Sequence, residues 1–217
     1  MKKQLIFTAI GLLLAVIGLN SCKKSDDTKP PANPIVLKNT AWTGEFNYSG
    51  GTTQPMSIAF GESGTLIWSE FKSEYTGSWT LENGLLTINL SGSVSFTANI
   101  SSDNTLTNIK STDGTGRKLL NAAQAAKDDV VLDGTKWSGS GVTLLFKAGT
   151  KLDLAFGGVG TLPTYTDVPY IRRGKAVYFS LAPKYDWFVV MSTSALMKGI
   201  NMAPSDPTVY TFFVTKL

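Results

Sequence analysis

The feature that most constrains how this chain folds is a ten-residue pattern that occurs twice. Residues 35–44 (IVLKNTAWTG) align with residues 130–139 (VVLDGTKWSG), with Leu, Thr, Trp and Gly at the same places. An alternating strand pattern and a later glycine follow in the same order in both copies, but at different spacings. Most of the extra length of the first copy lies in residues 45–55 (EFNYSGGTTQP). An ordered repeat of this kind predicts a duplicated structural unit whose loops differ in length.

Both copies alternate apolar and polar side chains, as half-buried strands do. The pattern is clear in Met56–Phe60 of the first copy and in Val142–Phe146 of the second, and a period of two with one apolar face is typical of antiparallel strands. Asn83-Gly84 lies between two such runs and predicts a hairpin, because both residues tolerate positive φ. We predict an all-β protein of two tandem antiparallel barrel or meander units, residues 35–116 and 130–217, related by internal duplication.

Two further segments bear on how the units are joined. The Ala-rich segment Arg117–Lys127 (RKLLNAAQAAK) predicts a short connector helix within residues 117–129. Asp186–Met191 (DWFVVM) and Val209–Val214 (VYTFFV) are apolar on both faces, and such strands usually have a second layer against their outer face. We expect that layer to be the first copy, so that the two units pack together.

The first 21 residues have the composition of a secretory signal peptide. Lys2 and Lys3 precede an apolar run from Leu5 to Leu19. A positive start, a short apolar core and a small residue before the cleavage point are typical of export signals. The run is shorter than the roughly 20 residues that span a bilayer as a helix.

Cys22 follows this run directly and is the single cysteine of the chain. Leu19, Ser21 and Cys22 resemble the lipobox of bacterial lipoproteins, with Asn20 where a small or apolar residue is usual. In that family the cysteine sulfur receives a diacylglycerol and its new α-amine is acylated, and several acyl chains anchor a protein stably. The resemblance implies lipidation of Cys22 and a membrane anchor; the alternative is a signal-anchor helix with an incidental cysteine.

Residues 22–34 read as a flexible tether, since they are polar, charged and rich in proline. The SCKK junction resembles lipoproteins of the Bacteroidota, which implies an outer-membrane location. Ser25-Asp26-Asp27 resembles the acidic tag that sends some of those proteins to the cell surface. An ordinary linker also contains such residues, so surface display and a periplasmic face both stay open.

Composition excludes several classes of chemistry. The chain has no histidine, which removes the commonest general base at neutral pH and the commonest zinc ligand. We therefore predict no catalytic residues, no metal site and no cofactor. A net charge of +4 gives no indication of nucleic-acid binding. The first copy is weakly acidic and the second basic, which favours mutual attraction or ordinary scatter over an anionic ligand.

Trp42 and Trp137 stand at the start of the first predicted strand of each copy. A Gly/Thr-Trp signature followed by a hairpin meander resembles lipocalin-like (calycin-like) domains, including those of Bacteroidota lipoproteins. The resemblance implies that each Trp lies at the closed end of a barrel, beneath a basic residue of the last strand. Lys110 would take that place for Trp42 and Lys216 for Trp137, a contact worth roughly 0.5–2 kcal/mol. An open barrel, or one larger barrel built from both copies, also fits these short repeats.

The same resemblance implies a binding function, commonly for small apolar molecules in the barrel mouth. Trp68, Tyr75 and Trp79 are candidate ligand contacts, because exposed aromatic rings can stack on sugars, although these residues are also ordinary strand formers. We predict a non-catalytic binding or accessory module for a small apolar molecule or a glycan. The alternatives are a structural or partner-docking envelope protein and, more distantly, a hydrolase that uses a pair of carboxylates.

Overall fold

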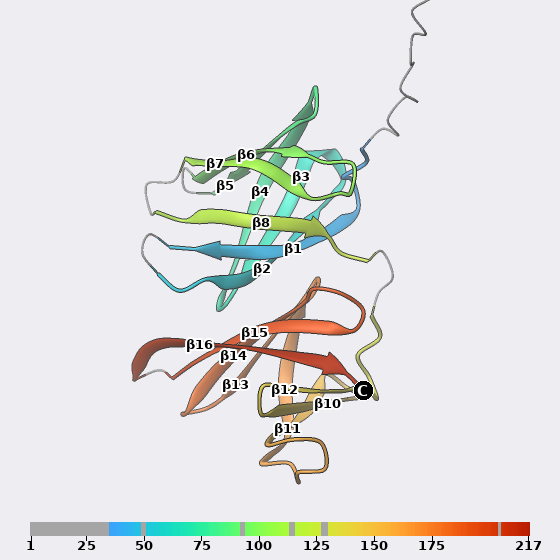
Figure 1. Cartoon of the computed structure of the whole chain (residues 1–217), viewed down its shortest axis with the longest axis vertical. Helices are drawn as coiled ribbons and strands as arrows, with labels where there is room; N and C mark the ends of the chain where they lie inside the picture. Colours follow the sequence, from blue (N-terminus) through green and yellow to red (C-terminus); the bar gives the residue numbers. More distant parts are fainter. Residues whose placement is uncertain (1–34, 49–50, 92–93, 113–115, 127–129, 204) are drawn as a thin grey trace, which may run out of the picture. The chain divides into compact units, whose positions relative to one another are not determined.

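The computed structural model describes residues 35–48, 51–91, 94–112, 116–126, 130–203 and 205–217. Residues 35–217 form one compact unit. This unit contains two eight-stranded antiparallel barrels that follow one another along the chain (Figure 1). The prediction of an all-β protein with two tandem units is confirmed, and the two copies form two barrels instead of one merged barrel.

The first barrel begins near the Trp42 signature. It consists of β1 (Thr40–Asn47), β2 (Gln54–Phe60), β3 (Thr65–Glu70), β4 (Ser73–Glu82), β5 (Leu85–Leu90), β6 (Val94–Ile100), β7 (Leu106–Thr112) and β8 (Lys118–Gln124), with the 3-10 turn Glu62–Gly64 between β2 and β3. Neighbouring strands pair in chain order from β1 to β7, and β8 pairs with the other edge of β1. β7 and β8 meet through a single described bridge, Thr105 to Ala123. This barrel is therefore nearly closed.

The second barrel repeats the meander and closes fully. It consists of β9 (Lys136–Gly139), β10 (Val142–Lys147), β11 (Lys151–Phe156), β12 (Tyr165–Arg173), β13 (Ala176–Leu181), β14 (Tyr185–Met191), β15 (Leu196–Ala203) and β16 (Asp206–Lys216). The four-residue strand β9 pairs with β10 on one side and with β16 on the other. Closure of the ring thus depends on a very short strand.

The two copies share their local chemistry as well as their strand order. In each, the Trp indole N–H donates to a Thr hydroxyl two residues earlier, at 3.0 Å for Trp42 and 2.9 Å for Trp137. The residue before that Thr has a positive φ in both copies, 59° at Asn39 and 76° at Gly134. A left-handed residue there is tolerated by Asn and Gly. The repeated pattern therefore encodes a repeated entry turn and a buried Trp.

The connector helix is a wrong prediction, because residues 118–124 form strand β8. This strand pairs with β1, with Ala122 opposite Gly44, and it buries Leu119 and Ala122 in the first barrel. A helix this short is marginal by itself, whereas the edge of β1 offers a full row of backbone hydrogen bonds. Tertiary pairing therefore overrides the helical propensity of the alanines. The last residues of the predicted helix, 127–129, lie outside the described residues.

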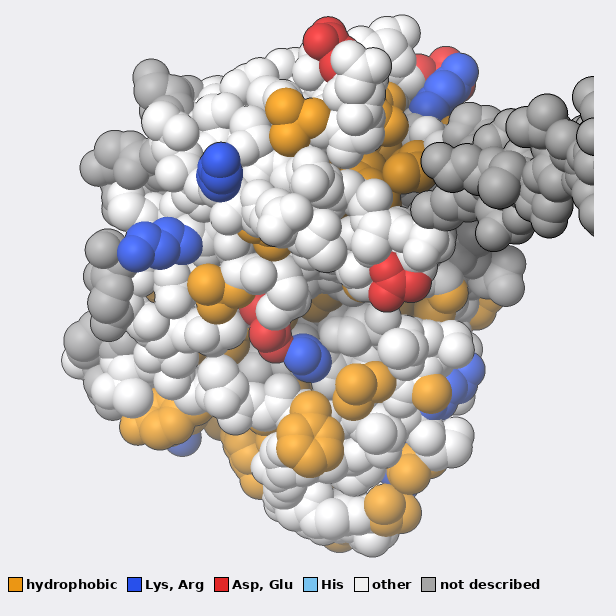
Figure 2. All heavy atoms as spheres, turned by 45° about the horizontal axis from the view of Figure 1, so that its top comes forward, with side chains coloured by type: hydrophobic (Ala, Val, Ile, Leu, Met, Phe, Trp, Pro, Cys, Tyr) orange, Lys and Arg blue, Asp and Glu red, His pale blue; other side chains and the backbone are white. Residues whose placement is uncertain are grey.

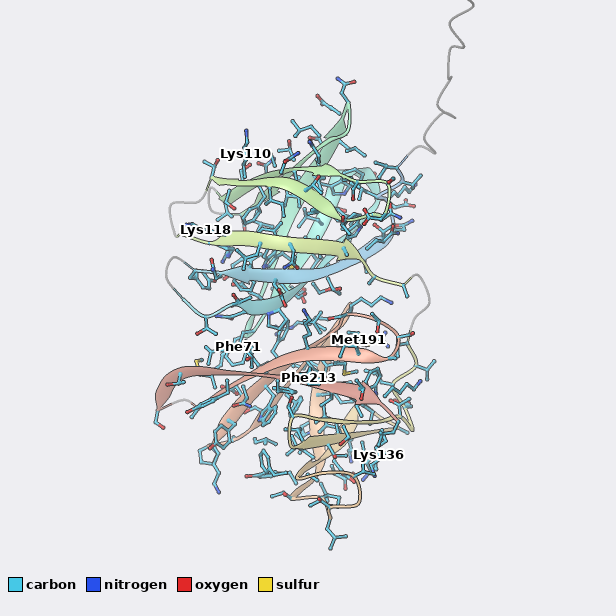
Figure 3. All side chains as sticks on the ribbon, viewed as in Figure 1. Phe71, Lys110, Lys118, Lys136, Met191 and Phe213 are labelled. Carbon is cyan, nitrogen blue, oxygen red and sulfur yellow. The ribbon has the colours of Figure 1, made fainter. Side chains whose placement is uncertain are left out.

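The expected second layer is confirmed for one of the two doubly apolar strands. In β14, Trp187 and Val189 pack inside the second barrel, while Phe188 and Val190 form an outer cluster that Phe71 of the first copy joins. Phe71 is labelled in Figure 3. For β16 the prediction holds only at Val209, which packs against the same outer cluster. Phe212 and Val214 of β16 point into the barrel, and Phe213 on the other face is 56% exposed.

Candidate functional site

The three aromatic residues expected to contact a ligand lie in the core of the first barrel. Trp68 is fully buried, and Tyr75 and Trp79 are partly buried against the same cluster. The Trp68 ring stacks on Phe96 with centroids 5.3 Å apart. These rings hold the barrel together, so the structure favours the packing interpretation for all three.

Trp68 also belongs to a buried polar cluster at Glu70. Its indole N–H donates to Glu70 Oε2 at 2.8 Å, and the Tyr48 hydroxyl donates to Oε1 at 2.6 Å. Arg117 Nη2 lies 3.2 Å from the same Oε1, and both charged side chains are almost fully buried. Burial and the hydrogen bond to Glu70 raise the pKa of Tyr48 to about 12. Each charge has its partner within the cluster, which makes it a structural element of the core.

The two lysines of the tryptophan signature are placed differently. Lys216 lies directly opposite Trp137 in the β9–β16 ladder, which is a strand pairing and not the stacked contact that the resemblance implies. Lys110 lies on β7 (Figure 3) and pairs with Thr97, and the residue of β8 opposite Trp42 is Gln124. Among the described residues, the cations that lie over aromatic rings are Lys72, Arg117 and Arg173, and none lies over Trp42 or Trp137.

The second barrel contains an open cavity of about 580 Å³. It lies beside the end of β9, beyond the two residue pairs that join β9 to β16. The lining is mostly aromatic and apolar, with short polar side chains at the rim. It consists of Ser140, Gly141, Val142, Phe156, Tyr185, Trp187, Asn201, Ala203, Tyr210, Thr211 and Phe212. Sequence reasoning did not find this site.

Trp187 forms the inner surface of the cavity. Its ring stacks on Phe179 with centroids 5.7 Å apart, and the Phe212 ring meets it edge-on at 5.0 Å. The indole Nε1 is buried and has no hydrogen-bond partner within the described part of the chain. A buried donor left unpaired costs about 1–3 kcal/mol. The cavity thus has an aromatic wall, and the unpaired indole nitrogen is enclosed within that wall.

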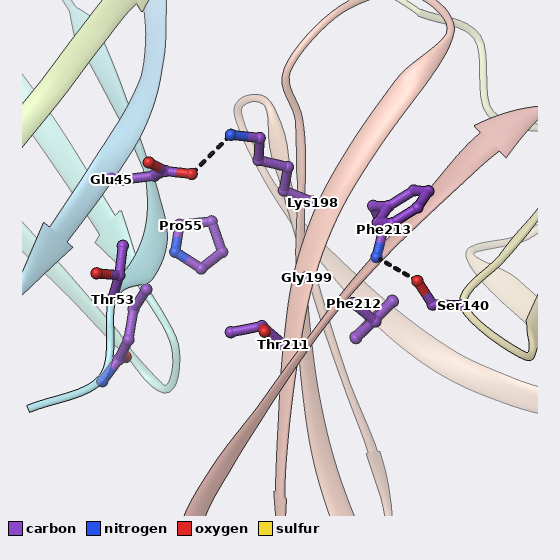
Figure 4. Close-up of a pocket in the computed structure, with 10 residues that line it drawn as sticks. Glu45, Thr53, Pro55, Ser140, Lys198, Gly199, Thr211, Phe212 and Phe213 are labelled. Carbon is purple, nitrogen blue, oxygen red and sulfur yellow. Dashed lines mark hydrogen bonds and ion pairs between the residues drawn. The ribbon is translucent and has the colours of Figure 1, made fainter.

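A second hollow, of about 440 Å³, adjoins the first at Ser140, Thr211 and Phe212 (Figure 4). On its wall, Lys198 Nζ lies 2.6 Å from Glu45 Oε1. Hydrogen bonds from Lys198 and Asn121 lower the pKa of Glu45 below its ordinary value. This hollow therefore has a closed ion pair on one side and the apolar surface of β16 on the other.

Apolar side chains are exposed around the aromatic cavity. Phe156 and Tyr210, which line it, are 43% and 51% exposed. Val159 and Leu162, in the loop that follows Phe156, are also largely exposed. Figure 2 shows apolar side chains at the surface of the second barrel. An exposed apolar rim around an apolar hollow is typical of a binding surface.

Other kinds of site receive no support from the arrangement of the described residues. They contain no cluster of three or more His, Cys, Asp or Glu side chains that could hold a metal ion. No helix in the described ranges is both long and apolar enough to cross a membrane. Asp153 and Asp167 both pair with Lys147, at 3.2 and 2.8 Å, so these neighbouring carboxylates share one ammonium group.

The fold and the cavity together define the class of protein. It is a tandem pair of eight-stranded antiparallel β-barrels, the second of which has an aromatic cavity that opens through its wall. Comparison with known proteins adds no closer identity, since no family model, no curated protein and no solved structure matches the chain.

Proposed function

We propose that this chain is a non-catalytic, lipid-anchored lipoprotein of the outer membrane that binds an apolar ligand in its second barrel. The observation that carries the proposal is the aromatic cavity of about 580 Å³ at Trp187, a volume typical of ligand sites. A lipocalin-like binding role is consistent with the two barrels and with the buried Trp at the start of each. Cys22 and the tether, residues 22–34, lie outside the described residues, so the anchor rests on the sequence.

Dye binding tests the proposed cavity. We expect an apolar fluorescent dye with an acceptor group, such as anilinonaphthalene sulfonate, to bind residues 35–217 saturably. Trp187→Phe reduces the aromatic surface that lines the cavity, so binding is expected to weaken by up to about tenfold. Trp79→Phe is the matched control, because Trp79 Nε1 is likewise buried without a described partner but belongs to the first barrel. If Trp187→Phe binds the dye as tightly as Trp79→Phe does, the dye does not bind in the cavity at Trp187.

Acylation tests the proposed anchor. In a bacterial host with the lipoprotein pathway, the parent chain should incorporate labelled palmitate and partition with membranes. Cys22→Ser removes the sulfur that would carry the diacylglycerol and should abolish both. A Cys22→Ser chain that still takes up the label would show that the lipoprotein interpretation is wrong.

Three other functions stay distinguishable from this one. A glycan ligand remains a candidate because Tyr185, Trp187 and Tyr210 offer rings to stack on sugars, and a glycan array with the Trp187→Phe control tests it. A partner-docking role without a small ligand is supported by the exposed Phe213. A hydrolase that uses paired carboxylates is third, and a mixed hydrolase screen addresses it.

A further inference from the structure

The cavity lies beside the shortest strand of the second barrel, β9, which closes the ring by pairing with only two residues of β16. Gly44 and Gly139 occupy equivalent places after the two signature tryptophans. In the first copy the strand continues to Asn47, and Phe46 pairs with Gln54 of β2. In the second copy the strand ends at Gly139, and Ser140-Gly141 turn directly into β10 with φ of 46° and 73°. The shorter hairpin leaves a gap where the longer one closes the first barrel.

Phe46 shows what fills this place in the first barrel. Its side chain is fully buried, and its ring meets Trp68 edge-on with centroids 5.8 Å apart. On the other side it lies opposite Leu119 of β8, the last strand of that barrel. By its order after the signature Trp, the residue of the second copy that corresponds to Phe46 is Gly141, which has no side chain to fill the interior.

The edge of β16 that borders the gap is paired near its C-terminal end and has no strand partner before Phe213 among the described residues. Leu217 N donates to Lys136 O at 2.9 Å, and Phe213 N donates to Ser140 Oγ at 3.2 Å. Alternate residues of a strand direct their N–H groups to the same side, so Thr211 N–H also points toward the gap. Among the described residues, the β9–β16 ladder contains Thr215 and Lys216, and Val209–Phe212 have no strand partner on that side.

We propose that the cavity of the second barrel is a strand-addition site for an extended peptide segment of a partner protein. The peptide pairs with β16 at Thr211 and directs one bulky apolar side chain inward, toward Trp187 and Phe212, as Phe46 is directed in the first barrel. Strand addition obtains its affinity from main-chain hydrogen bonds and its specificity from pockets for alternate side chains. The inference rests on the proposed binding role of this cavity and names its ligand class.

The first copy supplies the probe peptide. Thr43–Tyr48 (TGEFNY) is the segment that holds the equivalent place in the first barrel. Titrated into ¹⁵N-labelled residues 35–217, it is expected to shift the indole N–H resonance of Trp187, assigned by its loss in Trp187→Phe. The resonance of Trp79 serves as the internal control. The same peptide with Phe46→Asp should bind at least about tenfold more weakly, because a carboxylate would enter an apolar cavity.

Two variants of β16 test the pairing itself. Thr211→Pro removes the N–H that faces the gap and leaves the β15 side of the strand intact, since proline is tolerated at a free strand edge. It should weaken peptide binding at least about tenfold, whereas Thr211→Ala, which keeps the N–H, should bind as the parent does. Thermal unfolding checks that both variants fold. A Thr211→Pro chain that fails to fold is replaced by a peptide N-methylated at the two residues that flank its Phe, because alternate residues such as Ala41 face the last strand in the first copy.

The outcomes separate this inference from the proposed function. Peptide binding that requires both Phe46 and the Thr211 N–H supports strand addition. If the dye binds at Trp187 but the peptide does not, or if the peptide binds Thr211→Pro as well as it binds Thr211→Ala, strand addition is overturned and the apolar binding role stands. If neither dye nor peptide reaches Trp187, both proposals fail.

Discussion

Glu70 and Arg117 place two charges inside the first barrel, where either one alone would be strongly destabilising. A buried ion pair contributes little net stability, but removal of one partner leaves a desolvated charge. Here Tyr48 and Trp68 also donate hydrogen bonds to the Glu70 carboxylate. Loss of this carboxylate would therefore leave three buried donor groups without their acceptor. The sequence shows these residue types but not their contact, because Tyr48, Glu70 and Arg117 lie far apart in the chain.

Arg117→Leu is therefore expected to lower the free energy of unfolding by roughly 3–5 kcal/mol. Adding Glu70→Gln should recover part of that loss, since it removes the unpaired charge and keeps an acceptor oxygen for Trp68. Urea denaturation of residues 35–217 measures both changes. A loss below about 1 kcal/mol for the single variant, a value typical of surface pairs, would show that the pair is solvated.

At the scale of single strands, the sequence predicts features that depend on neighbouring residues better than features that depend on distant strand partners. Alternation correctly located β2 and β10, and Asn83-Gly84 forms the predicted hairpin turn between β4 and β5, with φ of 51° and 80°. These features depend on residues next to one another. The strand state of β8 and the gap beside β9 depend on partners far along the chain, so the helical propensity of an alanine-rich segment does not predict them. The extra length of the first copy at residues 45–55 is the sequence feature that could have indicated the cavity, because the second copy lacks this segment.

Gly44 and Gly139 test how closely the last strand of each barrel crosses the first. A Cβ on Gly44 would lie 2.0 Å from Asn121 O, and one on Gly139 would lie 2.6 Å from Phe213 O. We expect Gly44→Ala and Gly139→Ala each to lower the free energy of unfolding by roughly 1–3 kcal/mol or more, as overpacking does. Gly158→Ala is the control, because nothing lies within 4 Å of its Cβ. Denaturation curves for all three variants should separate the first two from the third.

At the scale of the whole molecule, the two copies are joined by a small apolar cluster and by ion pairs. Phe71 packs against the outer face of β14 and meets Tyr178 edge-on at 6.4 Å. Beside it, Lys72 pairs with Asp186, which also accepts a hydrogen bond from Tyr178 at 3.0 Å. The two barrels of the duplication are therefore not independent, because the Lys72–Asp186 ion pair joins one copy to the other.

The Asp186 carboxylate makes that contact sensitive to acid. Burial favours its neutral form, but hydrogen bonds from Lys72, Ser180 and Tyr178 outweigh burial and hold the pKa of Asp186 below its ordinary value. A carboxyl with a lowered folded pKa stabilises the fold above its unfolded pKa of about 3.9. This contribution is lost as the pH falls through the folded pKa.

Asp186→Asn is therefore expected to lower the free energy of unfolding at pH 7 by about 1.5–3 kcal/mol, the range for hydrogen bonds to charged groups. The difference from the parent should be largest at neutral pH and should shrink below about pH 4, where the carboxyl of the unfolded chain is protonated. Asp133→Asn, at an exposed position, serves as the control and should change stability little at either pH. Urea denaturation of residues 35–217 at pH 7 and pH 3 measures these differences. A constant difference between Asp186→Asn and the parent across this range would mean that the Lys72 contact does not depend on the charge of Asp186.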